Sequence, residues 1–166
     1  MNNKSLLVLI IITLLSISTV LISCQNSSEN HVEVEYVTGT KGFAEYMYFM
    51  QLYTQKLLLS VQSENRELAD FYHHELEEVT EDVIEHIQEY DGFPVGELTE
   101  AMLLHAMDNF EDALDADELN WDEIRHRARL IVRSCNACHE ATAHGYIRIP
   151  EEATINPFLQ DFDPTE

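Results

Sequence analysis

The chain has 166 residues, of which 45% are hydrophobic, and its 31 acidic residues outnumber nine basic ones. The formal charge of −22 at pH 7 excludes nucleic acid as a natural partner, because a polyanion gains nothing by approaching this surface. The same charge favours a basic protein partner. With seven Tyr and seven Phe the chain is too apolar for a disordered acidic protein, and its length suits one folded domain.

The N-terminal segment carries one charge, Lys4, followed by an apolar run that ends in Ser23 and Cys24. This pattern resembles a bacterial lipoprotein signal, in which cleavage before the cysteine leaves its sulfur attached to diacylglycerol. The resemblance implies a signal peptide over residues 1–23 and a lipidated Cys24. The protein would then be exported and anchored on the periplasmic face of the inner or outer membrane, or on the outer cell surface. An uncleaved membrane anchor is the alternative, and polar residues predict a flexible tether over 24–40.

From residue 41 to about 143 the apolar residues repeat with a period near 3.6, which indicates helices. We expect four of them, over about 41–62, 65–90, 96–116 and from Asn120 onward. Thr40 is a candidate N-cap, the segment 91–94 ends the second helix, and Glu123 three residues after Asn120 indicates a capping box. Short connections between long helices predict an all-α fold, an antiparallel up-and-down four-helix bundle over 41–150. The acidic residues 151–166 are expected to form an extended tail.

Each predicted helix has one apolar face that we expect to be buried. On the first helix this face carries Phe43, Met47, Met50, Thr54, Leu57 and Val61, and on the second Leu68, Tyr72, Leu76, Val79, Val83 and Ile87. On the third it carries Leu98, Met102, His105 or Ala106, Phe110 and Leu114, and on the fourth Ile124, Ala128, Ile131, Cys135 and Cys138.

The end of the fourth helix carries Cys135-Asn136-Ala137-Cys138-His139, the pattern for covalent attachment of a c-type haem. Two thiols add across the haem vinyl groups, and the adjoining histidine then meets the iron. On a helix these three side chains stand at i, i+3 and i+4, so one turn presents both sulfurs and the proximal ligand. The other nitrogen of His139 needs an acceptor, which the sequence does not identify. The motif predicts one covalent haem c per chain.

Other chemistries use the same residue types. A thiol redox pair normally lies at the start of a helix that follows a strand, whereas this pair is late in a helix. Zinc needs four ligands, and Cys135, Cys138, His139 and His144 are the local candidates. A disulfide between the two cysteines would close too small a loop to stabilise the fold much.

A four-helix bundle with its haem motif near the end of the last helix resembles the cytochrome c-prime family and its relatives, over roughly residues 41–150. A closer likeness is to small bundle cytochromes with a shared pattern along the first two helices and after the motif. The matching residues are Met47, Gln51, Lys56-Leu57, Asn65, Leu68-Ala69-Asp70-Phe71, Glu75 to Glu78 and Gly145-Tyr146-Ile147-Arg148-Ile149-Pro150. This chain has Tyr53 and Thr54 where members of that group often carry histidines before the Lys-Leu pair.

In related bundles the haem lies between the first and last helices, so the resemblance implies that the ligand opposite His139 comes from the first helix. Met47 is our first choice and Met50 the second, because a thioether suits haem iron in electron carriers. Methionines at this spacing are also ordinary core residues, in which case the iron is five-coordinate. The histidines considered as other axial ligands are His73, His74, His86 and His105.

Arginines recur every four residues on the last helix, at Arg125, Arg129 and Arg133. Arg129 or Arg133 is a candidate to neutralise a haem propionate. The alternative is pairing with acidic neighbours.

These features predict a single-electron carrier with no substrate chemistry of its own. Its expected partners are basic redox proteins and the membrane that holds its lipid anchor, and the sequence leaves a homodimer open. The alternative is a five-coordinate haem module that binds or senses NO or CO. A third interpretation is a haem-free helical lipoprotein that acts as an interaction module.

Overall fold

The computed structural model describes residues 42–153, 155–158, 160 and 162–164. The predicted signal peptide, the tether, Thr40 and Cys24 lie outside the described residues. Helices account for most of the described chain, in the order α2 (Phe43–Gln62), α3 (Arg66–His86), α4 (Val95–Thr99), the π-helical η1 (Glu100–Leu104), α5 (His105–Leu114) and α6 (Trp121–Ala141). The described residues contain no strand beyond one isolated bridge, Tyr90 with Phe93. The all-α prediction is confirmed.

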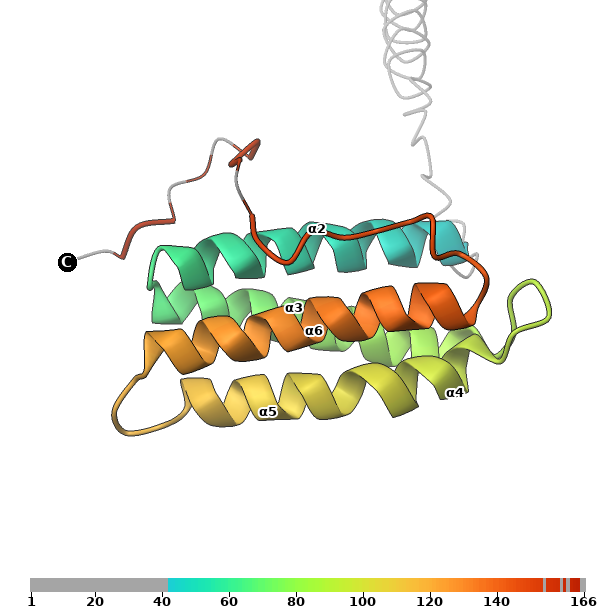
Figure 1. Cartoon of the computed structure of the whole chain (residues 1–166), viewed down its shortest axis with the longest axis horizontal. Coiled ribbons are helices and arrows are strands. Elements are labelled where there is room, and N and C mark those ends of the chain that lie inside the picture. Colours follow the sequence, from blue (N-terminus) through green and yellow to red (C-terminus); the bar gives the residue numbers. More distant parts are fainter. Residues whose placement is uncertain (1–41, 154, 159, 161, 165–166) are drawn as a thin grey trace, which may run out of the picture. The chain divides into compact units, whose positions relative to one another are not determined.

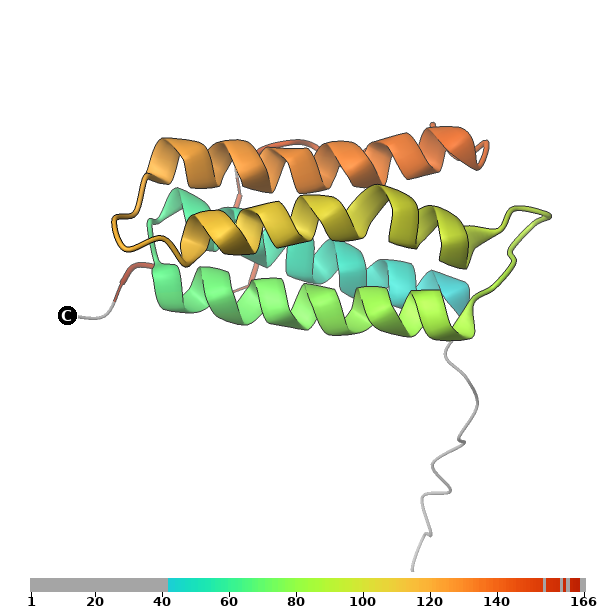
Figure 2. The ribbon, with the colours of Figure 1, turned by 90° about the horizontal axis from the view of Figure 1, so that it is seen from below.

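The long helices lie alongside one another (Figures 1 and 2), and their contacts form a ring. Helix α2 packs against α3 and α6, while α5 packs against α6 and α3. Phe110, Leu76 and Ile124, from three different helices, are fully buried at 0% exposure. None of the described helices combines the length and apolar character needed to cross a membrane.

Helix ends are set by local side chains. Asn65 begins α3 by accepting a hydrogen bond from the Leu68 amide at 3.1 Å. Asn120 begins α6 in the same way, accepting from the amides of Asp122 and Glu123. The Glu123 carboxylate accepts from Arg127 at 2.6 Å, so Glu123 contributes its backbone to the cap and its side chain to an ion pair. At α2 the N-cap position is occupied by Gly42.

The second helix is shorter than predicted, because it ends at His86 instead of near residue 90. Asp91 and Gly92 have positive φ angles of 51° and 82°, which makes the two-residue turn of a tight hairpin. Tyr90 and Phe93 on either side exchange two backbone hydrogen bonds of 3.0 Å. This hairpin requires an extended backbone that a helix through residue 90 would not allow.

The third helix is interrupted by a π-helical segment, and its predicted buried face is wrong in its first half. Val95, Thr99, Leu103 and Met107 are buried, whereas Leu98 and Met102 are only half-buried. Of the two alternatives at the next position, His105 is exposed, while Ala106 is half-buried and packs against the core. Four buried residues at steps of four drift around a regular helix of 3.6 residues per turn. The wider π turn at Glu100–Leu104 corrects this drift. Phe110 and Leu114 are buried as predicted.

The chain after α6 has no regular secondary structure in its described part, yet it lies against the helices (Figure 1). Phe162 is 5% exposed, with its ring centroid 6.3 Å from that of Tyr72. The Asn65 amide donates to the carbonyls of Phe162 and Asp163 at 3.0 Å, and the Tyr72 hydroxyl donates to Gln160 at 2.8 Å. This acidic tail is therefore part of the folded domain.

Candidate functional site

A cavity of about 390 Å³ lies between α2, α4, η1, α6 and the loop after α6; we call it the α2–α6 cavity. It is lined by Phe43, Ala44, Met47, Tyr48, Met50, Gln51, Thr54, Tyr90, Val95, Thr99, Met102, Leu103, Ser134, Cys135, Cys138, His139, Thr142, His144, Ile147, Arg148 and Ile149. The structure thus brings together all three residues of the haem motif and both candidate methionines. Its size and its mostly apolar wall with a few polar groups are typical of small-molecule and cofactor sites.

The motif cysteines lie on the same face of α6 as its buried residues, because the helical period continues to the end of the helix. Ile124, Ala128 and Ile131 are buried at 0–1% exposure, and continuing the same face brings Cys135 and Cys138 to the cavity wall. Burial raises the pKa of the Cys135 thiol to about 12 and also raises the pKa of Cys138. Reactive redox thiols have lowered pKa values, so this environment is unlike that of a thiol redox pair.

His139 lies in the last turn of α6 and is held by the loop that follows it. Its Nδ1 is 2.8 Å from the carbonyl oxygen of Ile147. A carbonyl only accepts hydrogen bonds, so this contact requires the proton to be on Nδ1 and leaves the lone pair of Nε2 free to bind a metal. The acceptor that the sequence did not identify is therefore the Ile147 carbonyl.

The opposite wall belongs to α2. Met47 is half-buried, while Met50 is 8% exposed and belongs to the core. One turn further on, Thr54 is 2% exposed, and its Oγ1 has no hydrogen-bond partner among the described residues. A buried hydroxyl without a partner is costly in an apolar wall, so Thr54 marks a place where the cavity can satisfy a polar group.

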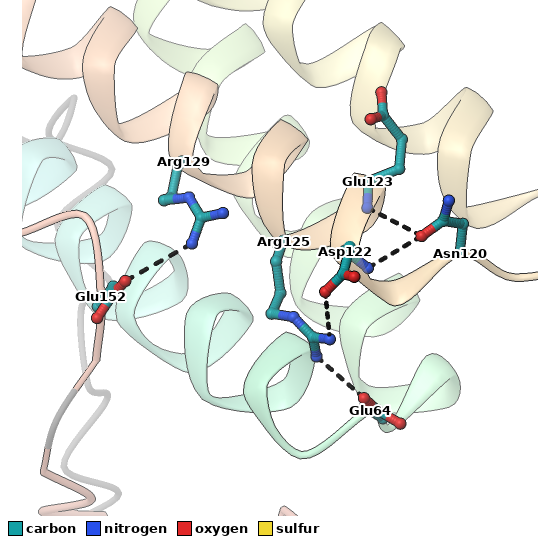
Figure 3. A network of polar contacts seen from close by, with 7 residues as sticks. All are labelled: Glu64, Asn120, Asp122, Glu123, Arg125, Arg129 and Glu152. Carbon is teal, nitrogen blue, oxygen red and sulfur yellow. Dashed lines mark hydrogen bonds and ion pairs between the residues drawn. The ribbon is translucent and has the colours of Figure 1, made fainter.

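The two predicted propionate partners are ion-paired elsewhere. Arg129 lies 3.6 Å from Glu152, and Arg133 donates to Glu151 at 2.9 and 3.0 Å. Figure 3 shows Arg129 reaching Glu152, which belongs to the chain after α6. Neither arginine is among the cavity residues, whereas Arg148 is.

Arg125, the third member of the row, binds Asp122 and Glu64 at 3.0 Å (Figure 3). These carboxylates hold the pKa of the Arg125 guanidinium above its usual value. The acidic partners thus account for the row of arginines on α6.

The histidines considered as other axial ligands are not among the residues that line the α2–α6 cavity. His73 is 3% exposed with its ring 5.1 Å from that of Phe110, and His105 is hydrogen-bonded to Asn109. His74 lies 3.4 Å from Glu78, and His86 lies 3.9 Å from Asp82.

Sequence reasoning overlooked two of the lining residues as functional candidates, Thr54 and Arg148. Thr54 was assigned to the buried face and noted as a departure from related cytochromes, which often carry a histidine there. Arg148 was noted only within the pattern after the motif, in a segment without helical period. A basic residue shortly after the motif in a chain this acidic was the available signal.

Both motif cysteines are free thiols, so they are not joined as a disulfide. In the part of the chain that the structure describes, no three His, Cys, Asp or Glu residues form a group that could hold a metal ion. Comparisons with models of known families, with curated proteins and with solved structures find no match.

Proposed function

We propose that this chain is a c-type cytochrome that carries single electrons on one covalently attached haem and catalyses no reaction on a substrate. The observation that supports this most directly is the composition of the α2–α6 cavity. Cys135, Cys138 and His139 line it from α6, and Met47 and Met50 line it from α2. Residues that could attach a haem and residues that could bind its iron thus line one cavity, although the two groups are more than 80 positions apart in the sequence.

The residues present fit a haem. Cys135 and Cys138 would form the thioethers, and His139 has its Nε2 available because Nδ1 donates to Ile147. Bound haem supplies a one-electron iron couple whose potential depends on the axial ligands, the burial and the neighbouring hydrogen bonds. Met47 is the proposed distal ligand, with Met50 as second choice. Arg148 is better placed than Arg129 or Arg133 to neutralise a propionate, because it lines the cavity while they bind glutamates.

The proposed topology is an antiparallel up-and-down four-helix bundle of the cytochrome c-prime-like group. Three features support it: the ring of helix contacts, short connections such as residues 63–65 and 115–120, and the motif near the end of α6. In such a bundle the first and last helices are neighbours, and here α2 and α6 are in contact.

The distal wall also favours a second function, in which the sixth position of the iron takes NO or CO. Thr54 supports this alternative, because its buried hydroxyl has no partner within the described part of the chain and lies in the wall formed by α2. An unsatisfied hydroxyl at this depth can donate a hydrogen bond to a small polar ligand.

The proposed location is an exported membrane face, with the domain attached through a lipid on Cys24. The proposed partner is a basic redox protein, and the acidic groove between α2 and α3 supports this preference. That groove is lined by Phe49, Tyr53, Glu75, Glu78, Val79, Glu81, Asp82 and Glu85. A strongly acidic surface speeds the encounter with a basic partner.

Mass spectrometry tests the proposal on the full chain matured in a host with haem-ligation machinery. We expect the polypeptide to gain the mass of one haem. Replacing both Cys135 and Cys138 by alanine should abolish this gain. The matched control is Ala137→Ser, which changes an exposed residue inside the motif and should keep the haem. A wild-type chain that matures without haem would contradict the proposal.

A further inference from the structure

The side chain of Asn136, a variable position of the haem motif, is bonded at both ends to the backbone of one residue. Its Nδ2 donates to the Ile149 carbonyl at 2.9 Å, and its Oδ1 accepts from the Ile149 amide at 2.8 Å. These two bonds join the chain after α6 to the helix less than one turn before His139. Because the NH2 group and the carbonyl oxygen of the same side chain are both bonded, this contact has a defined geometry.

The loop between α6 and Ile149 is therefore held at both ends. At its start the His144 amide donates to the His139 carbonyl at 2.7 Å, and the Ile147 amide donates to the His144 carbonyl at 2.8 Å. At its far end Asn136 holds Ile149. The Ile147 carbonyl that accepts from His139 lies between these fixed points.

Without the bonds from Asn136, water would compete with His139 for the Ile147 carbonyl. Ile147 is 47% exposed and Tyr146 is 80% exposed, so burial contributes little to holding the loop in place. A loop with few buried contacts opens at low cost. The contact between Ile147 and His139 thus depends on the hydrogen bonds at either end of the loop.

We propose that Asn136 is a positioning residue that holds the Ile147 carbonyl against Nδ1 of His139, and that it thereby sets the tautomer and the electron donation of this ligand. The inference rests on the proposed function, because it takes His139 as the proximal ligand. A hydrogen bond from Nδ1 to a carbonyl makes the imidazole a stronger donor through Nε2. This stabilises oxidised iron relative to reduced iron. Loss of the contact should therefore raise the reduction potential.

The test compares Asn136→Ala and Asn136→Asp with the wild-type chain. Alanine removes both bonds, whereas aspartate keeps the acceptor for the Ile149 amide and loses the donor to its carbonyl. The matched control is Asn156→Ala: Asn156 also bonds to backbone at both ends, with Gln160 at 2.7 Å and Phe158 at 3.1 Å, but neither partner belongs to the loop that carries Ile147. Circular dichroism checks that each variant is folded.

Two readouts separate positioning from general stability. In the haem-free full chain, nitrogen-15 NMR of the His139 ring reports which nitrogen carries the proton. We expect Asn136→Ala to lose part of the Nδ1-protonated form, Asn136→Asp to lose less, and Asn156→Ala to match wild type. In the haem-bound protein, redox titration should show a higher potential for Asn136→Ala. Loss of an outer-shell partner typically lowers metal affinity or activity 10–100-fold. Taking the lower end of this range for the ratio of oxidised to reduced iron, we expect about a tenfold shift, or about 59 mV.

The idea is overturned if Asn136→Ala leaves both the ring signals and the potential at wild-type values, or if Asn156→Ala changes them equally. If Asn136→Ala does not fold, a partial shift of both readouts in Asn136→Asp supports the proposal, and none overturns it. If no haem attaches to wild type, the proposed function fails, while the ring signals of the haem-free chain still decide whether Asn136 positions His139.

Discussion

Replacing each candidate methionine by leucine tests whether Met47 or Met50 is the distal ligand of the proposed haem iron. Leucine keeps nearly the same volume but has no sulfur, so it removes a ligand without leaving a hole. We expect Met47→Leu to convert a low-spin spectrum with a sulfur-to-iron band into a high-spin one. Met50→Leu should keep the wild-type spectrum.

The burial of the two side chains gives the expected stability changes. Met50 is 8% exposed in the core, so Met50→Ala should cost about 2–5 kcal/mol in the free energy of unfolding, and Met50→Leu less than about 1.5 kcal/mol. Met47 is half-buried beside the cavity, so Met47→Ala should cost about half as much as Met50→Ala. The leucine variants nearly conserve side-chain volume, so their packing cost should be similar in the haem-free and haem-bound chains, whereas loss of a ligand appears only with haem bound.

The assay is a urea titration of both forms, read alongside the optical spectrum of the haem-bound form. If both leucine variants keep the low-spin spectrum, the assignment of the distal ligand to α2 methionines is refuted. If wild type is already high-spin and its spectrum shifts on adding CO, the gas-binding alternative replaces electron transfer. Equal losses of stability with and without haem would make both methionines core residues only.

Two further predictions concern the fold. Phe162→Ala should lower the free energy of unfolding by about 3 kcal/mol in a urea titration, because it removes a buried ring that contacts Tyr72. Ile155 lies in the same tail but is 71% exposed, so Ile155→Ala should change the free energy of unfolding by less than about 0.5 kcal/mol. Equal effects would mean that the tail is not docked in solution. Ala143 has a φ of 60° just after α6, a backbone conformation that glycine adopts at lower cost than alanine. Ala143→Gly should therefore raise the free energy of unfolding by about 0.5–1 kcal/mol and with it the melting temperature. Gly92 has a φ of 82°, so Gly92→Ala should lower the melting temperature. Changes of the same sign in both variants would contradict this reasoning.

The helices were predictable because their signals are local. Asn65 and Asn120 lie within three residues of the amides that they cap, and the apolar period of α6 continues unbroken from Ile124 to Cys138. The end of α3 and the π turn were not predictable in this way. The π turn keeps Leu103 and Met107 facing the core, which depends on the helices packed around it. At Gly96 an added Cβ would lie 3.1 Å from the Ile84 carbonyl oxygen, so a larger residue there would require the end of α3 to shift.

By itself the sequence determined the motif and the face of the helix that carries it, because Cys135, Cys138 and His139 are related by one turn of the same helix. Only the tertiary structure decided what surrounds them. The acceptor for His139 is the Ile147 carbonyl, and the cation beside the cavity is Arg148 instead of Arg129 or Arg133. Both outcomes depend on a loop without helical period, whose path is set by hydrogen bonds that no sequence spacing encodes.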